Sequence, residues 1–242
     1  MKRSEMLRFL ILRTIGNFLV LFAIFGIIAT FGPAIYYEVS FRVSEARGIH
    51  YVVSSKFQVQ SSKIVNVPNS ELPKTQSAGI DNFAQVLSGP KVQELMPSDT
   101  SFSILIPKIG ATAKIFPNVD PSDQNKFLPI LMQGVAHAAG SVFPGMAGNI
   151  YLFAHSTDNF WDVGRYNAVF YLLKDLKKGD DVVIFYKNQR YNYVVTGSKI
   201  VDPSDVSNLV DSQKQNKQQL VLQTCWPPGT TFQRLLVFAS PK

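Results

Sequence analysis

The stretch from Thr14 to Tyr37 constrains the fold more than any other part of the chain. It reads "TIGNFLVLFAIFGIIATFGPAIYY" and carries no charged residue. A helix needs about 20 apolar residues to cross the hydrocarbon core of a bilayer. No second run of this length follows in the 242 residues. The sequence therefore predicts a single-pass membrane protein with an N-terminal transmembrane helix.

The charges flanking this run predict its orientation. Lys2, Arg3, Arg8 and Arg13 precede it against one acidic residue, whereas basic and acidic residues balance after it. The positive-inside rule then puts the N-terminus in the cytoplasm and everything after about residue 40 outside, at the cell membrane. A cleaved signal peptide is the alternative, but its apolar region is usually shorter, and no small-x-small cleavage site follows the run. An uncleaved anchor is the favoured interpretation.

Four segments follow from composition: a cytoplasmic tail (1–13), a transmembrane anchor (14–37), an extracytoplasmic stalk (38–99) rich in Ser, Gln, Asn and Pro, and a folded domain (100–242). Short β-type runs separated by Gly, Pro, Asn and Asp fill the last segment. One helix is predicted over 163–180, ending near Gly179. This pattern is typical of a mainly β protein, and we expect a closed or nearly closed eight-stranded β-barrel with short helices. The predicted strands are 101–108, 112–117, 134–140, 149–156, 181–188, 190–201, 219–225 and 234–240.

Charge and cysteine count narrow the function. The formal net charge is +7 and is spread diffusely, so a polyanionic surface such as a membrane or cell wall could attract the domain. No basic motif interleaved with aromatic residues is present, which argues against nucleic acid as a partner. Cys225 is the only cysteine, so no internal disulfide can form. A lone thiol outside the cell is buried and inert, paired with another chain, or kept because it reacts.

Three residues at predicted strand ends point to thiol chemistry. A thiol becomes a strong nucleophile only as a thiolate, and histidine is its usual partner. Cys225 ends "LVLQTC" and His155 ends "NIYLFAHS", so on adjacent strands they would lie side by side. Arg234, in the next strand, stays protonated and can stabilise an oxyanion but cannot serve as a base. Taken singly, each has a structural alternative: an inert buried thiol, a hydrogen-bonded rim imidazole, or half of an ion pair.

Taken together, these motifs resemble the sortases, the membrane-anchored cysteine transpeptidases of the bacterial cell surface. "ILIPKIGATAKIF" is similar to the family's opening strand pair, and "GVAHAAGSVFPGMAGNIYLFAHS" to the stretch that leads to its catalytic histidine. "SKIVDPSDVSNLV" is similar to the strand end and loop before the Thr-Leu-x-Thr-Cys signature. The likeness covers most of residues 100–242. The order of His, Cys and Arg agrees, as does the N-terminal anchor.

The resemblance implies a role for each residue. Cys225 would attack the threonine carbonyl of a C-terminal sorting motif of the LPxTG kind and form a thioacyl enzyme. His155 would exchange protons with the departing and incoming amines, and Arg234 would position the peptide and stabilise the oxyanion. The partners would be surface proteins carrying the sorting signal and an amine acceptor, such as a peptidoglycan precursor or another surface protein. Candidate substrate-binding residues are Thr224, Trp226 and His137, for the last of which a structural role is the stronger alternative.

The chain departs from the family pattern at Val221, Gln233 and Ala154, which stand where Thr, His and Gly are common. The short Cys-to-Arg spacing and the absence of a lid motif before the domain resemble class D or E more than class C. We expect no cofactor and no metal, because Asp120 and Asp123 alone make a poor calcium site. Two alternatives stay open: a cysteine hydrolase acting on the same peptides, and a membrane-anchored binding module with an inert cysteine.

Overall fold

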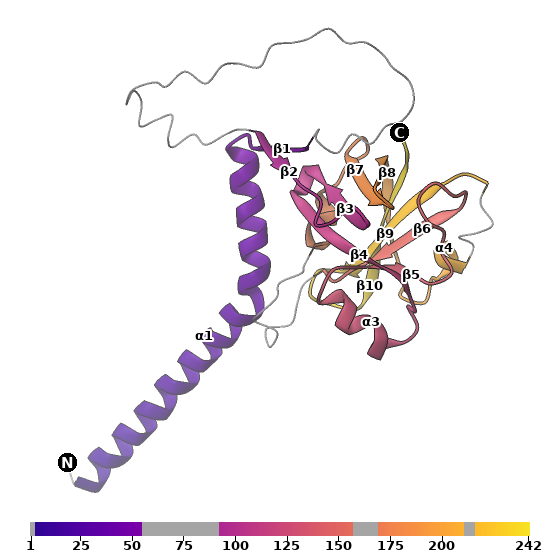
Figure 1. Ribbon diagram of the computed structural model, residues 1–242. Coiled ribbons are helices and arrows are strands. Elements are labelled where there is room, and N and C mark those ends of the chain that lie inside the picture. The colour runs from indigo at the N-terminus through magenta and orange to yellow at the C-terminus, as the bar shows by residue number, and fades with distance from the viewer. Residues whose placement is uncertain (1–2, 55–91, 157–168, 211–215) are drawn as a thin grey trace, which may run out of the picture.

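A long N-terminal helix leads into a β-barrel in the computed structural model, which describes residues 3–54, 92–156, 169–210 and 216–242 (Figure 1). The predicted strands all occur, with shifts of a few residues at their ends. The elements are α1 (Arg3–Ala46), β1 (His50–Val53), β2 (Val92–Leu95), β3 (Phe102–Ile106), η2 (Pro107–Ile109), β4 (Ala111–Val119), α3 (Gln124–Leu131), β5 (Val135–Ala138), β6 (Asn149–Phe153), η3 (Tyr171–Asp175), β7 (Asp181–Tyr186), β8 (Gln189–Val201), α4 (Ser207–Val210), β9 (Gln219–Trp226) and β10 (Gln233–Pro241).

Eight strands close into a barrel in the order β10-β8-β7-β3-β4-β5-β6-β9. Most neighbours are antiparallel, but β4 pairs with β5, and β6 with β9, in parallel. The mainly β fold with a closed eight-stranded barrel is therefore confirmed. The strand directions put the ends of β3, β6 and β9 and the starts of β7 and β10 at one end of the barrel, called the mouth below.

Alternation of side chains builds the barrel core. On each strand every second residue points inward, as the period of two requires. Leu220 and Leu222 of β9 and Ile150 and Leu152 of β6 are fully buried in this way. η3 and its neighbours add further apolar side chains: Phe170, Tyr171, Leu172, Leu173 and Leu176 join the same cluster.

Two outer faces of the barrel are also covered. Over β5, β6, β9 and β10, α3 and α4 contribute Leu131 and Leu209 to a second cluster. Over β3 and β7, the parallel pair β1–β2 packs Tyr51, Val53 and Leu95 onto a third. Tyr51 lies against Gly110, where a Cβ atom would be 2.9 Å from the Tyr51 ring. β1 and β2 are therefore built into the domain although they fall within the expected stalk.

The N-terminal helix contains one segment, Arg8–Ile28, long and apolar enough to cross a membrane. The helix continues past Tyr37 to Ala46, so the expected stalk begins as helix. Its last turns contact the mouth of the barrel, where Phe41 packs against the core cluster. Lys174 of η3 joins Glu38 at 2.7 Å, and Arg42 joins Asp175 at 3.2 Å.

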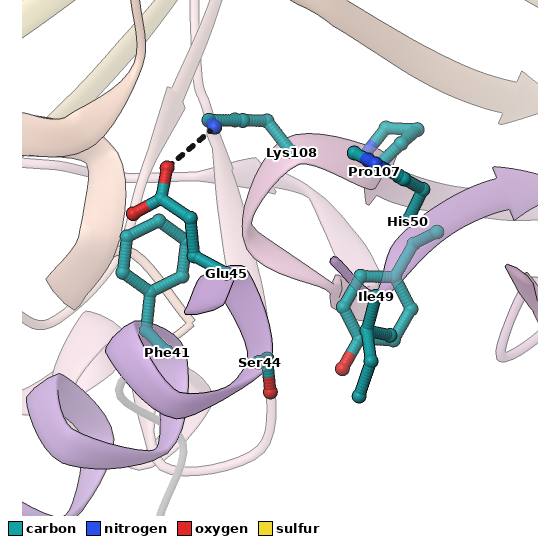
Figure 2. Close-up of a pocket in the computed structure, with 8 residues that line it drawn as sticks. Phe41, Ser44, Glu45, Ile49, His50, Pro107 and Lys108 are labelled. Atoms are coloured by element: carbon teal, nitrogen blue, oxygen red, sulfur yellow. Dashed lines mark hydrogen bonds and ion pairs between the residues drawn. The ribbon is translucent and has the colours of Figure 1, made fainter. Parts of the chain in front are cut away.

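A pocket of about 170 Å³ lies where α1, β1 and η2 meet (Figure 2). The Glu45 carboxylate of α1 and the Lys108 ammonium of η2 pair across it at 3.1 Å. Phe41, Ile49 and Pro107 supply apolar lining. No residue expected to act in catalysis lines this pocket, so we treat it as part of the contact between α1 and the barrel.

The predicted helix over 163–180 is wrong in the part that the structure describes. Only Tyr171–Asp175 is helical there, as a short 3₁₀ segment, and residues 157–168 lie outside the described part. The apolar spacing that indicated a helix instead serves the barrel interior, because Phe170, Leu173 and Leu176 all point into it. Gly179 (φ 103°) belongs to the turn before β7, where its N–H donates to Val195.

Candidate active site

The ends of β6 and β9 bring His155 and Cys225 together in the backbone. These strands run parallel, with Phe153 opposite Gln223. The pairing continues one step further, because the Ala154 N–H donates to the Gln223 carbonyl at 3.2 Å. Thr224 Oγ1 donates back to the Ala154 carbonyl at 3.1 Å. The next residues along the chain are His155, two positions past the end of β6, and Cys225 of β9, so the two occupy neighbouring positions at the mouth.

β10 brings Arg234 to the other side of the cysteine. In the antiparallel pairing of β9 with β10, Arg234 lies directly opposite Cys225. Residues directly opposite in such a pair have Cβ atoms about 4.5–5.5 Å apart and project from the same face. Neighbouring strands are about 4.8 Å apart. The backbone therefore sets out His155, Cys225 and Arg234 as one row across three adjacent strands.

The row lies on the outer face of the barrel. Leu220 and Leu222 of β9 point inward, so Val221, Gln223 and Cys225 alternate outward. Leu236, opposite Gln223, is likewise in the outer cluster. Cys225 is half-exposed on this face, whereas a thiol in the barrel interior would be sealed from a long polypeptide.

The polar groups of the row are half-buried. Cys225 is a free thiol of intermediate exposure, and the His155 and Arg234 side chains are exposed to a similar degree. Arg234 Nη1 donates to the carbonyl oxygens of Thr231 and Gln233, both at 3.0 Å. These bonds fix the guanidinium beside the β9–β10 connection. Among the described residues Nε and Nη2 have no acceptor, so they are available to a ligand.

The three candidate substrate-binding residues are not part of this outward-facing row. Thr224 points to the inner side and is 3% exposed, with its hydroxyl bonded to Ala154 as described. Trp226 is half-buried against the inner core cluster at the barrel rim. His137 is fully buried in β5, on the inner side with Val135.

Both ring nitrogens of His137 have partners within the protein. Nδ1 accepts from the Asn118 N–H at 3.3 Å, and Nε2 lies 3.1 Å from the Val142 carbonyl and 3.0 Å from Ser141 Oγ. The ring stacks on Phe143 with centroids 4.4 Å apart. Burial lowers the pKa of His137, so the neutral form is favoured. These contacts give the residue a structural role in holding the turn after β5.

Two further residues on the outer face were not among the predicted site residues. The Tyr151 hydroxyl donates to Gln223 Oε1 at 2.5 Å, just below the row that contains Cys225. Burial raises the pKa of Tyr151, the charge of Arg234 lowers it and that of Asp205 raises it, so both charges lie near the ring. Counting back by twos from Cys225 and His155 along their strands would have found both residues.

The acidic loop residues serve the fold. Asp123 is the N-cap of α3, accepting from the Asn125 N–H at 3.1 Å and pairing with Lys126 at 2.9 Å. Asp120 accepts from the backbone and hydroxyl of Ser122. Within the described residues, no group of three or more His, Cys, Asp or Glu side chains is placed to hold a metal ion.

Comparisons with known proteins identify the family of the barrel domain. The sortase domain family model matches residues 104–242. Sortase D of Bacillus subtilis (strain 168) is 30% identical over 122 residues, which are 50% of this chain and 52% of that protein. The chain thus aligns with about half the length of this curated relative. The match is compatible with the class D or E resemblance.

Solved sortase structures are similar as well. Sortase C-1 from Actinomyces oris is 26% identical, with a TM-score of 0.50 and coverage of 60% of this chain and 76% of that one. Sortase A from Corynebacterium diphtheriae is 28% identical, with a TM-score of 0.48 and coverage of 59% and 60%. The family model spans more than half of the chain and covers the β3–β10 barrel apart from the first two residues of β3. The chain belongs to the sortase family.

Proposed function

We propose that the protein is a membrane-anchored cysteine transpeptidase that cleaves a sorting motif of the LPxTG kind and transfers the acyl part to an amine. The observation that carries the proposal is the row formed by His155, Cys225 and Arg234 on three adjacent strands. Family membership supports it, because a nucleophile, an acid–base group and an oxyanion stabiliser are what thiol acyl transfer needs.

The proposed first half-reaction forms a thioester. The Cys225 thiolate attacks the threonine carbonyl carbon, and Arg234 stabilises the resulting oxyanion. When the carbon–nitrogen bond breaks, His155 gives a proton to the departing amine. The donor's leaving segment is released, and its acyl part remains on sulfur.

The second half-reaction reverses these roles. An incoming amine attacks the thioester, His155 takes its proton, and the thiolate departs. The new amide joins donor to acceptor, and the enzyme returns to its starting state. Because a thioester retains the reactivity of the acyl group, this exchange needs no external energy source. The proposed acceptor is an amine of a peptidoglycan precursor or of another surface protein.

We also propose that Arg8–Ile28 anchors the protein in the membrane with the N-terminus in the cytoplasm. The apolar length of the helix supports this, as do the basic residues before the segment (Lys2 and Arg3) and in its first two turns (Arg8 and Arg13). A membrane-impermeant maleimide would test the orientation in intact cells. With Cys225→Ala as background, it should label Ser240→Cys near the C-terminus and leave Ser4→Cys unlabelled.

The activity is tested with full-length protein in detergent micelles, an LPxTG peptide and triglycine. We expect intact-mass spectrometry to detect the acyl adduct on Cys225 without acceptor and ligated peptide with it. Cys225→Ala should abolish both, and Arg234→Ala should slow adduct formation by about 100-fold or more, as loss of an oxyanion donor does.

Two outcomes would favour the alternatives. Peptide cleavage whose products are unaffected by triglycine would indicate a hydrolase. Absence of any adduct across a library of LPxTG-type motifs, combined with slow alkylation of Cys225 by iodoacetamide in the native protein, would indicate a binding module with an inert thiol. Fast alkylation is expected of a thiolate beside an imidazolium.

A further inference from the structure

Below the row that contains Cys225, the outer face has one polar position in an apolar row. Phe153 of β6 and Leu236 of β10 lie opposite Gln223 on its two sides. Both apolar side chains are buried, whereas Gln223 is half-buried. A glutamine at the centre of an apolar row is costly unless its polar groups have partners. Its hydrogen bonds therefore decide what the position can do.

Tyr151 supplies one partner. Its hydroxyl donates to Gln223 Oε1 at 2.5 Å, from a ring that is 4% exposed. Since the oxygen is engaged by a donor, the amide group is oriented and its nitrogen points away from Tyr151. Among the described residues the structure gives this nitrogen no acceptor. An amide held by one end presents two N–H donors at a fixed place.

We propose that Gln223 binds the substrate by donating a hydrogen bond from Nε2 to a main-chain carbonyl of the bound peptide, on the N-terminal side of the scissile bond, and that Tyr151 is its positioning residue. The inference rests on the proposed function, since it presumes a peptide attacked by Cys225. Gln223 and Cys225 are two residues apart on β9, about 6.6 Å along the strand. An extended peptide has the same two-residue repeat, so with one carbonyl at the sulfur it places another over Gln223.

Three variants of the full-length protein separate donation from mere burial. Gln223→Met keeps the shape and removes both polar groups. Gln223→Glu still accepts from Tyr151 but, ionised, cannot donate. Tyr151→Phe leaves the amide in place but frees it to rotate. With an LPxTG peptide we expect Gln223→Met and Gln223→Glu to lower kcat/KM about three- to tenfold, mainly through KM, and Tyr151→Phe to do so by a smaller factor.

A thioamide scan identifies the acceptor. Sulfur replaces the carbonyl oxygen in turn at each of the three residues before the scissile threonine, which weakens the acceptor. At one of these positions we expect the thioamide to lower kcat/KM of the wild type relative to the normal peptide. For Gln223→Met, which lacks the donor, the same thioamide should leave kcat/KM unchanged. The alkylation rate of Cys225 by iodoacetamide is the control and should match the wild type. Thermal melts show that each variant is folded at the assay temperature, because loss of the Tyr151–Gln223 hydrogen bond lowers Tm.

The results distinguish the two hypotheses. If the wild type forms no acyl adduct, the proposed function fails and this inference falls with it. If the wild type turns over normally and Gln223→Glu does the same, the function stands and the inference is refuted. Equal thioamide penalties in wild type and Gln223→Met at every position would also refute it.

Discussion

Replacing Thr224 by valine tests whether this residue binds substrate or holds the site together. The hydroxyl donates to the Ala154 carbonyl, directly before His155, from a side chain that is 3% exposed. Valine matches threonine in shape, so the change removes the hydrogen bond and leaves a carbonyl without this donor. A lost hydrogen bond of this kind, with a buried acceptor left behind, costs about 1–2 kcal/mol. For a domain of this size that lowers Tm by about 2–8 °C.

The assay pairs thermal melts of the full-length protein in detergent, followed by near-UV circular dichroism, with turnover of an LPxTG peptide. We expect Thr224→Val to lower Tm as stated and to lower kcat, because the backbone next to His155 loses its tie to β9. Thr224→Ser keeps the hydroxyl and should behave nearly as the wild type. An unchanged Tm together with a raised KM would refute this reasoning and return Thr224 to the substrate-binding residues.

Three further predictions concern the barrel. Burial lowers the pKa of His137, so at mildly acidic pH the unfolded chain binds a proton that the folded protein excludes. The free energy of unfolding should therefore fall as pH drops below about 6.5, by up to about 1.4 kcal/mol per pH unit. His137→Gln should flatten this slope in melts between about pH 7 and 5.5. Leu222→Ala should cost about 2–5 kcal/mol in chemical denaturation, since this fully buried side chain leaves a cavity. Gly134→Ala should cost at least about 1–3 kcal/mol, because its Cβ would lie 2.4 Å from the Lys114 carbonyl oxygen, whereas Gly197→Ala, with nothing within 4 Å, should have little effect.

The strands of the barrel were predictable because each carries its own signal. Apolar runs bounded by Gly, Pro, Asn and Asp mark β3 to β10 within a few residues. α3 was missed because it is only eight residues long and Pro129 lies inside it. The helix predicted over 163–180 failed for the opposite reason, since apolar residues at helical spacing were recruited singly into the barrel interior.

The site was predictable in its residues but not in its geometry. Strand ends pointed to Cys225, His155 and Arg234, yet the parallel pairing of β6 with β9 joins residues 70 positions apart, which no local pattern encodes. The roles of Thr224 and His137 depend on which face of a strand they occupy. Register decides this, and a shift of one residue would reverse it.

The contact between α1 and the mouth of the barrel limits how far from the membrane the catalytic site can lie. The residues of α1 that pair with the barrel, Glu38 and Glu45, follow Ile28, the last residue of the apolar segment, by 10 and 17 positions. At 1.5 Å per residue they lie about 15–25 Å along the helix from the end of that segment. If α1 spans the bilayer as proposed, its contact with the barrel holds the catalytic centre at this distance from the membrane. A domain on a flexible linker would instead reach a much larger volume. The substrate proteins would have to present their cleavage sites within a few nanometres of the lipid surface, while they are still attached to the membrane.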